Sequence, residues 1–101
     1  MNEQESYSEA PLKEAIENEC AILCQTLLRK NALYGNSAMK KPLLAPYVSE
    51  VGALAVRLSD KINRLLTMLQ SHVDDKEESM EDTLLDIAGY CLLWRIKSYK
   101  D

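Results

Sequence analysis

One loop of the sequence gathers side chains that suit a nucleotide. In chain order they are Lys30, Tyr34, Gly35, Asn36, Ser37, Lys40 and Lys41. Tyr34 offers a ring face for stacking on a base, while Asn36 and Ser37 offer hydrogen bonds. The lysines add positive charge, so the loop could hold a base and a phosphate. The alternative is an ordinary helix end with Gly35 in a left-handed cap, and a cap and a binding loop can coexist.

Three cations and a carboxylate follow one side of a segment with a helical pattern. Arg57, Lys61 and Arg64 are spaced by four and three residues, so a helix places them in a row. Guanidinium groups form paired, charge-assisted hydrogen bonds with phosphate, and a lysine adds a mobile charge. Asp60 lies beside them. In the alternative interpretation Asp60 forms an ordinary surface ion pair with Arg64.

Two carboxylates further along the chain are candidate ligands of a metal ion. Asp82 and Asp86 are one helical turn apart, and Mg²⁺ prefers oxygen ligands. Asp86 shares its face with Leu93, so its charge would need a partner, either an arginine (Arg57 or Arg64) or the metal ion. Alternatively, Asp82 is explained as part of a helix cap.

Length and charge exclude several classes of protein. The chain has 101 residues, enough for one domain and too few for two. Its formal net charge of -4 argues against a general affinity for duplex DNA. Charged residues interrupt every apolar segment, so we expect no membrane span. The acidic, polar first residues do not resemble a signal peptide, which predicts a cytoplasmic protein.

The cysteines and the single histidine predict neither a disulfide framework nor a zinc site. Cys20 and Cys24 lie one turn apart in an apolar stripe, where we expect them to pack as small hydrophobic side chains. His72 is the only histidine, and no cysteine lies near it in sequence. We therefore expect no required cofactor, with Mg²⁺ as the one candidate metal.

Three long helices must position these groups. Apolar residues recur at helical spacing over about residues 11–31, 48–70 and 79–99. Pro11 suits the first turn of the first helix, and Ser79 suits the cap of the third. The sequence therefore predicts an all-α fold of three helices.

The predicted domain organisation is simple. Residues 1–10 should form a flexible acidic N-terminus, residues 11–101 a single helical domain, and the charged stretch 71–79 a solvated connection within it. The third helix is apolar around most of its circumference, more than two partner helices can cover. Its apolar residues are Leu84, Leu85, Ile87, Ala88, Cys91, Leu92, Leu93, Trp94 and Ile96. We therefore expect a homo-oligomer, most simply a two-fold dimer, that completes the helical bundle.

Three ordered segments form a pattern that is more specific than any one of them. They are Lys30 to Ser37 (KNALYGNS), Arg57 to Leu65 (RLSDKINRL) and Glu78 to Tyr90 (ESMEDTLLDIAGY). This pattern resembles the small phage and bacterial family called nucleotide modification associated domain 1, over about residues 19–94. The resemblance implies an all-helical domain that handles nucleotides and, if a phage encodes it, works in the host cytoplasm.

A more distant similarity is to the all-α nucleotide pyrophosphatases of the MazG type. In that group two helices supply acidic residues to Mg²⁺, and the segment 82–93 looks like the second of them, with Asp86 at its acidic position. The helix that should carry a glutamate cluster instead has Arg57, Asp60, Lys61 and Arg64. Cations in place of metal ligands favour a direct grip on phosphate over metal-assisted hydrolysis.

Three functions follow as hypotheses. The first is a phage-type protein that holds a phosphorylated, cyclic or modified nucleotide without transforming it, to support nucleotide modification or to sequester a host-defence signal. The second is a Mg²⁺-dependent pyrophosphohydrolase of nucleoside triphosphates that uses Asp60, Asp82 and Asp86, with Glu50 or Glu81. The third is a helical interaction protein with no small ligand. The positive charges on the second helix favour the first hypothesis, binding without transformation.

Overall fold

Three long helices and one short 3-10 turn make up the fold. The computed structural model describes residues 9–71 and 79–100. The elements are α2 (Glu9–Tyr34), η1 (Ser37–Met39), α3 (Glu50–Ser71) and α4 (Met80–Lys100). The described residues contain no strand, so the predicted all-α fold is confirmed.

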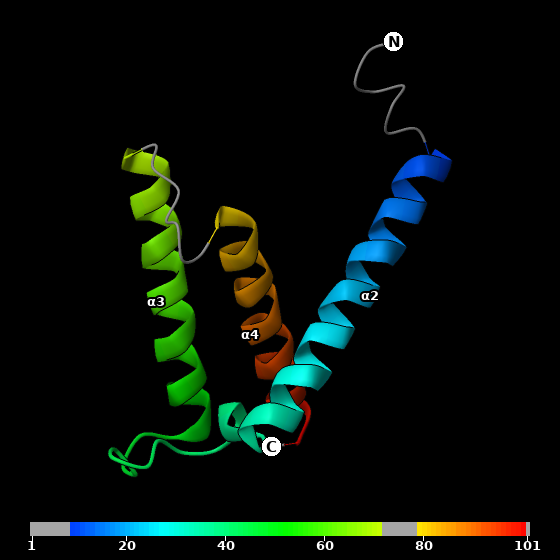
Figure 1. The fold of residues 1–101 in the computed structure, drawn as a ribbon. Helices are drawn as coiled ribbons and strands as arrows, with labels where there is room; N and C mark the ends of the chain where they lie inside the picture. Colours follow the sequence, from blue (N-terminus) through cyan, green and yellow to red (C-terminus); the bar gives the residue numbers. More distant parts are fainter. Residues whose placement is uncertain (1–8, 72–78, 101) are drawn as a thin grey trace.

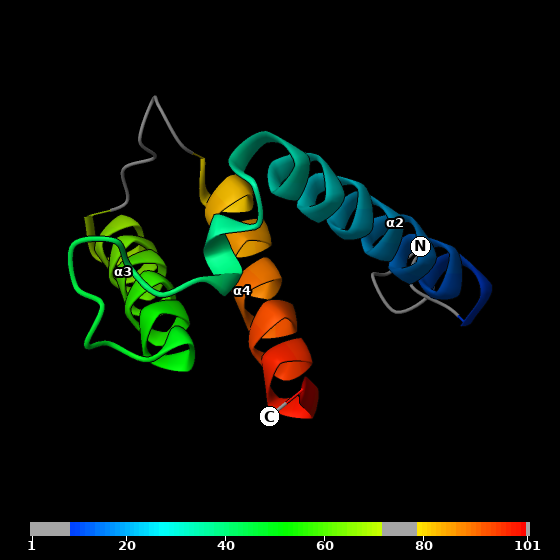
Figure 2. The same ribbon diagram turned by 90° about the horizontal axis from the view of Figure 1, so that it is seen from below.

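Helices α3 and α4 pack against each other as an antiparallel pair. In both views of the ribbon, α4 lies between α3 and α2 (Figures 1 and 2). An ion pair between Glu50 and Lys97 joins the start of α3 to the end of α4. The apolar side chains buried among the described residues come from these two helices: Ala53, Leu54, Met68 and Leu93. The core of the molecule is therefore the α3–α4 pair.

Serine side chains begin both helices of this pair. The Ser49 hydroxyl accepts a hydrogen bond from the Gly52 backbone N–H at 2.9 Å, and the Ser79 hydroxyl accepts one from the Asp82 N–H at 3.1 Å. Each hydroxyl satisfies a donor that the first helical turn leaves without a partner. The start of the third helix predicted at Ser79 is confirmed, and Asp82 lies in its first turn, as the capping interpretation requires.

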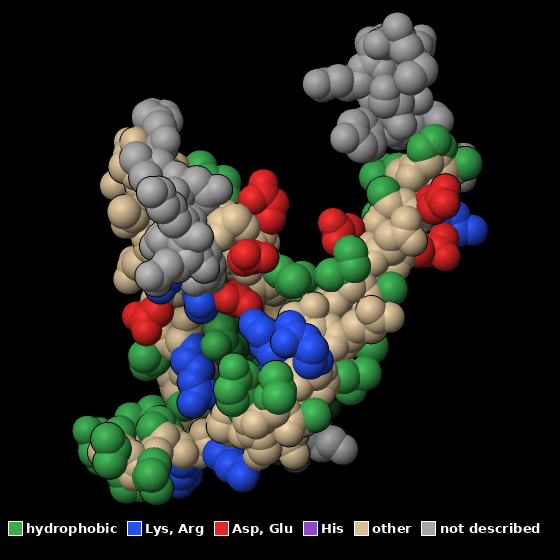
Figure 3. Space-filling view, viewed as in Figure 1, with side chains coloured by type: hydrophobic (Ala, Val, Ile, Leu, Met, Phe, Trp, Pro, Cys, Tyr) green, Lys and Arg blue, Asp and Glu red, His purple; other side chains and the backbone are tan. Residues whose placement is uncertain are grey.

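Helix α2 meets the pair only near its C-terminal end and diverges from α4 toward its N-terminus (Figure 1). Every described side chain of residues 10–22 is exposed, whereas Leu23 and Leu27 are half-buried. Hydrophobic side chains remain visible along the diverging helices (Figure 3). The prediction that Cys20 and Cys24 pack as small hydrophobic side chains is wrong for the single chain, because both are exposed. The stripe is real, but the described chain does not cover its first half.

Parts of two predicted segments lie outside the described residues. The acidic N-terminus was predicted for residues 1–10, of which 1–8 are not described and 9–10 begin α2. The predicted connection 71–79 is described only at its two ends. None of the helices in the described ranges is both long and apolar enough to cross a bilayer.

Candidate functional site

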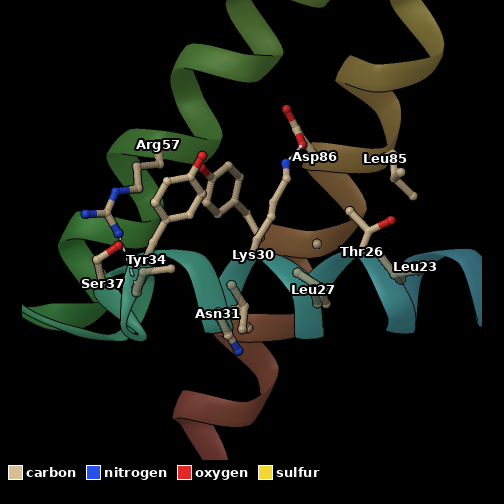
Figure 4. Close-up of a pocket in the computed structure, with 14 residues that line it drawn as sticks. Leu23, Thr26, Leu27, Lys30, Asn31, Tyr34, Ser37, Arg57, Leu85 and Asp86 are labelled. Carbon is tan, nitrogen blue, oxygen red and sulfur yellow. Dashed lines mark hydrogen bonds and ion pairs between the residues drawn. The ribbon is translucent and has the colours of Figure 1, made fainter.

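A pocket lies at the closed end of the V formed by α2 and α4, where α3 and η1 also contribute walls (Figure 4). Its volume is about 260 Å³, near the lower end of the roughly 300–1,000 Å³ typical of small-molecule sites. The lining residues are Leu23, Thr26, Leu27, Lys30, Asn31, Tyr34, Ser37, Ala38, Arg57, Leu85, Asp86, Gly89, Tyr90 and Leu93. Two tyrosine rings and two cations thus share one largely apolar cavity.

The end of α2 delivers Tyr34 and Ser37 to this pocket through a tight cap. Gly35 and Asn36 both have left-handed backbone conformations, with φ of 59° and 61°. The Asn36 N–H donates to the Asn31 carbonyl at 3.2 Å, which is the six-residue closure of a Schellman motif. The predicted left-handed cap at Gly35 is confirmed. The chain reverses there, so the residues on either side of the cap both face the cavity.

Asp86 of α4 joins two lysines from the other helices. Lys30 Nζ of α2 lies 2.9 Å from Asp86 Oδ1, and Lys61 Nζ of α3 lies 3.0 Å from Asp86 Oδ2. In Figure 4 the Lys30 side chain rises from α2 to the carboxylate. This three-residue ion-pair cluster links all three long helices, and its members Lys30 and Asp86 line the pocket.

The two lysines keep the Asp86 carboxylate ionised. Burial acts to raise the pKa of Asp86, but hydrogen bonds and positive charge from Lys30 and Lys61 outweigh it and lower the pKa below its ordinary value. Where the sequence suggested an arginine as the partner of Asp86, the structure has two lysines, and a metal ion at Asp86 stays a prediction. Lysines extend far enough to reach the carboxylate from α2 and α3, which flank α4.

Arg57 contributes the third cation and ties α3 to the short 3-10 turn. Its Nη1 donates a hydrogen bond to the Ala38 carbonyl at 3.2 Å. Figure 4 shows its guanidinium group beside Tyr34 and Ser37. This hydrogen bond holds the guanidinium next to an aromatic ring and a hydroxyl, an arrangement suited to a ligand with both a ring and an anionic group.

Gly89 sets how closely α2 approaches α4. A Cβ atom at this buried position would lie 3.1 Å from Leu27 Cδ2 and 3.9 Å from Leu23 Cδ1. A larger side chain would therefore push Leu27 outward and fill the floor of the pocket. The glycine allows the two helices to meet at this point.

The structure brings five of the predicted ligand-binding residues to the pocket wall and leaves three away from it. The cavity is lined by Lys30, Tyr34, Ser37, Arg57 and Asp86. Lys61 does not line it but forms an ion pair with Asp86, which does. Asn36, Asp60 and Arg64 are exposed and do not line it. Asn36 has a structural role instead, because its backbone N–H closes the cap of α2.

Sequence analysis missed three polar residues of the pocket. Thr26 and Asn31 lie on α2, and Tyr90 lies on α4. Each is one turn from a residue that was identified: Thr26 precedes Lys30 by four positions, Asn31 precedes Tyr34 by three, and Tyr90 follows Asp86 by four. Helical spacing alone could have found them, since residues three or four apart share a face.

The donor set does not suit a divalent metal ion. Each carboxylate oxygen of Asp86 is within 3.0 Å of a lysine ammonium, where a metal would meet like charge. Asp82 is exposed in the first turn of α4. Across the described ranges, no group of three or more histidine, cysteine, aspartate or glutamate side chains is placed to hold a metal. The lysine contacts of Asp86 do not favour Mg²⁺ binding by Asp82 and Asp86, which stays a prediction.

Comparisons with known proteins leave the chemistry of this pocket as the basis for function. No protein-family model, curated protein or solved structure matches the chain. The pocket combines aromatic rings, hydroxyl groups and cations. Three cations, Lys30, Lys61 and Arg57, lie at the site with a single carboxylate, Asp86, so the site has a positive surplus within a protein of net charge -4. Such a local field attracts anions that the whole molecule would repel.

Proposed function

We propose that the protein binds a phosphorylated nucleotide in this pocket and holds it without transforming it. The observation that carries the proposal is the positive surplus beside Tyr34 and Tyr90 in an otherwise acidic protein. The resemblance to nucleotide modification associated domain 1 supports the same ligand class. A phage protein of this kind could support nucleotide modification or sequester a nucleotide signal of host defence in the host cytoplasm.

Each part of the pocket has a matching part of the ligand. Of the two tyrosine rings in the pocket, Tyr34 is the more accessible, with 65% of its surface exposed, and can stack on a base. Arg57 from α3 and Lys30 from α2 line the same pocket (Figure 4), and either can contact an anionic group of the ligand. A phosphate there would compete with Asp86 for Lys30, and Lys61 would remain to balance the carboxylate.

Binding is favoured over hydrolysis by the state of Asp86. A metal-assisted pyrophosphohydrolase needs several free carboxylate oxygens around Mg²⁺. Asp86 has both oxygens engaged by lysines. The adjoining face of α3 carries Arg57 and Lys61 where the MazG-type resemblance would require acidic ligands. These cations can bind the negative charge of an intact phosphate directly, without a metal ion. This supports a protein that holds its ligand rather than one that hydrolyses it.

Calorimetric titration with matched ligands tests the proposal. The panel is a nucleoside, its mono-, di- and triphosphates, and cyclic mono- and dinucleotides. We expect at least one phosphorylated member to bind far more tightly than the nucleoside, because each charge-assisted hydrogen bond contributes about 1.5–3 kcal/mol. Equal affinity for nucleoside and nucleotide would contradict the role assigned to the cations.

Two pairs of variants locate the binding. Tyr34→Ala should weaken binding by about 1–3 kcal/mol through lost stacking, while Tyr34→Phe retains it. Arg57→Met should weaken binding of nucleotides, whereas Arg64→Met, two turns along the same helix and outside the pocket, should not. If Tyr34→Ala and Arg57→Met bind every ligand as tightly as the parent, the pocket is not the site.

A further inference from the structure

We propose that a second copy of this chain docks in the open groove between α2 and α4, and that the first half of α2 is the segment it inserts. The groove is lined by Glu19, Cys20, Ile22, Leu23, Glu81, Asp82, Leu84, Leu85 and Ala88. It is apolar on its floor and acidic at its rim. The proposal concerns the assembly of the protein and does not depend on the ligand.

The apolar stripe of α2 shows where the partner must lie. Leu12, Ile16 and Cys20 continue, at helical spacing, the face on which Leu23 and Leu27 pack toward α4. The second half of this face is covered by the same chain. The first half is exposed because the two helices diverge, with 42% of Leu12 and 54% of Ile16 accessible. One continuous stripe thus has an intramolecular partner over only half its length.

Helix α4 presents the complementary surface. Leu84 and Leu92 are exposed on its side away from α3, and exposed Ala88 lies between them. A two-fold axis would place the α2 stripe of each copy against the groove of the other. Both copies would then bury the same two surfaces, the stripe and the groove. Self-complementarity of this kind favours a second copy over an unrelated protein.

The rim of the groove is acidic. Acidic side chains flank the open end on both helices, whereas lysine and arginine gather toward the closed end (Figure 3). The acidic rim groups of the groove are Glu19, Glu81 and Asp82. The first half of α2 carries one lysine, Lys13, and several glutamates, among them Glu14 and Glu17. The apolar stripe, rather than charge, therefore carries the proposal.

The single chain exposes more surface than a compact monomer of its mass. The chain exposes 7838 Å², whereas a compact monomer of its mass exposes about 5,800 Å². Its radius of gyration is 16.3 Å, against about 13 Å for a compact chain of 100 residues. An interface between stable subunits buries about 800 Å² or more on each partner, which this open structure can supply.

The groove also adjoins the pocket. Leu23 and Leu85 line both cavities, so they form a shared wall. A partner helix in the groove would cover this wall from outside and complete the enclosure of the pocket. The second copy would therefore border the ligand site without supplying the residues that carry its charge.

Analytical ultracentrifugation over a dilution series, on the full chain and two matched variants, tests the proposal. Ile16→Asp places a charge in the middle of the inserted stripe. It should raise the dissociation constant of the dimer by roughly a hundredfold or more, since a buried unpaired carboxylate is strongly unfavourable. Leu28→Asp is the control, because Leu28 lies on the same helix, is 64% exposed and faces away from the stripe. It should dimerise as the parent does. Circular dichroism establishes that both variants remain helical.

Alkylation of Cys20, followed by peptide mass spectrometry, gives a second readout that does not depend on mutation. Cys20 is exposed in the single chain and lies in the groove, so dimerisation should slow its reaction and dilution should restore it. A parent that stays monomeric at high concentration, with Cys20 reacting as an open thiol, overturns the proposal. A dimer that survives Ile16→Asp with unchanged affinity overturns the assigned surface.

Discussion

The two halves of α2 carry the same stripe and meet different surroundings. The second half packs toward α4 over Gly89 and sends Lys30 to Asp86, which closes one end of the molecule into a pocket. The first half has the same apolar spacing, but the side chains of residues 10–22 are exposed. Periodicity therefore predicts which face of a helix is apolar, while specific contacts decide where that face is covered.

The largest difference between the closed and open ends should be in packing energy. Leu93 is 6% exposed and faces both the core and the pocket, whereas Leu84, on the same helix, is 49% exposed at the groove. Leu93→Ala should lower the free energy of unfolding by about 2–4 kcal/mol because it leaves a cavity. Leu84→Ala should change it by less than about 1 kcal/mol in dilute solution. Urea denaturation of the two variants measures both, and equal losses would contradict the comparison.

A smaller effect should follow from removing the charge that joins the three helices. Asp86→Asn keeps the shape of the side chain and leaves Lys30 and Lys61 close together without a carboxylate. We expect a loss of about 1–2 kcal/mol in unfolding free energy, less than for a fully buried pair because the lysines retain contact with water. Asp82→Asn, one turn away and exposed, is the matched control, and its loss should be smaller. A neutral Asp86→Asn would show that the cluster does not hold the closed end together.

The contribution of the same cluster should depend on pH. The pKa of Asp86 is lowered in the folded protein because the two lysines outweigh burial. A lowered folded-state pKa stabilises at pH values above the unfolded value of about 3.9, and this stability is lost as the pH falls through the folded value. The stability gap between the parent and Asp86→Asn should thus stay constant from neutral pH down to about pH 5 and then shrink in more acidic solution. A gap that widens on acidification would contradict this assignment.

The smallest effect should come from the open half of α2. Ile16→Ala removes a side chain that is 54% exposed in the single chain, so its unfolding free energy in dilute solution should change by no more than about 0.5 kcal/mol. At concentrations that favour the dimer, the same variant should be less stable than the parent. A large loss in dilute solution would mean that the single chain already covers this half of the helix.

The sequence predicted the helices and their caps better than it predicted the site. Helical spacing and local cap chemistry depend on neighbouring residues, so Ser79, Gly35 and the three-helix pattern were identified correctly. The partners of Asp86 could not be deduced, because they depend on which helices flank α4. Spacing on α3 placed Arg57, Lys61 and Arg64 in one row, but the crossing of the helices turns Arg57 into the pocket and Lys61 toward Asp86. The exposure of Cys20 and Cys24 likewise follows from the divergence of α2 and α4, which no local pattern encodes.

The most direct test of the central claim is a phosphorus NMR experiment on the parent protein with Mg²⁺ and the tightest-binding phosphorylated nucleotide from the calorimetric panel. The account predicts that the ligand's phosphorus resonances shift or broaden on binding and that the same ligand is recovered intact after release. The appearance of pyrophosphate or inorganic phosphate in proportion to the protein would contradict it and establish turnover.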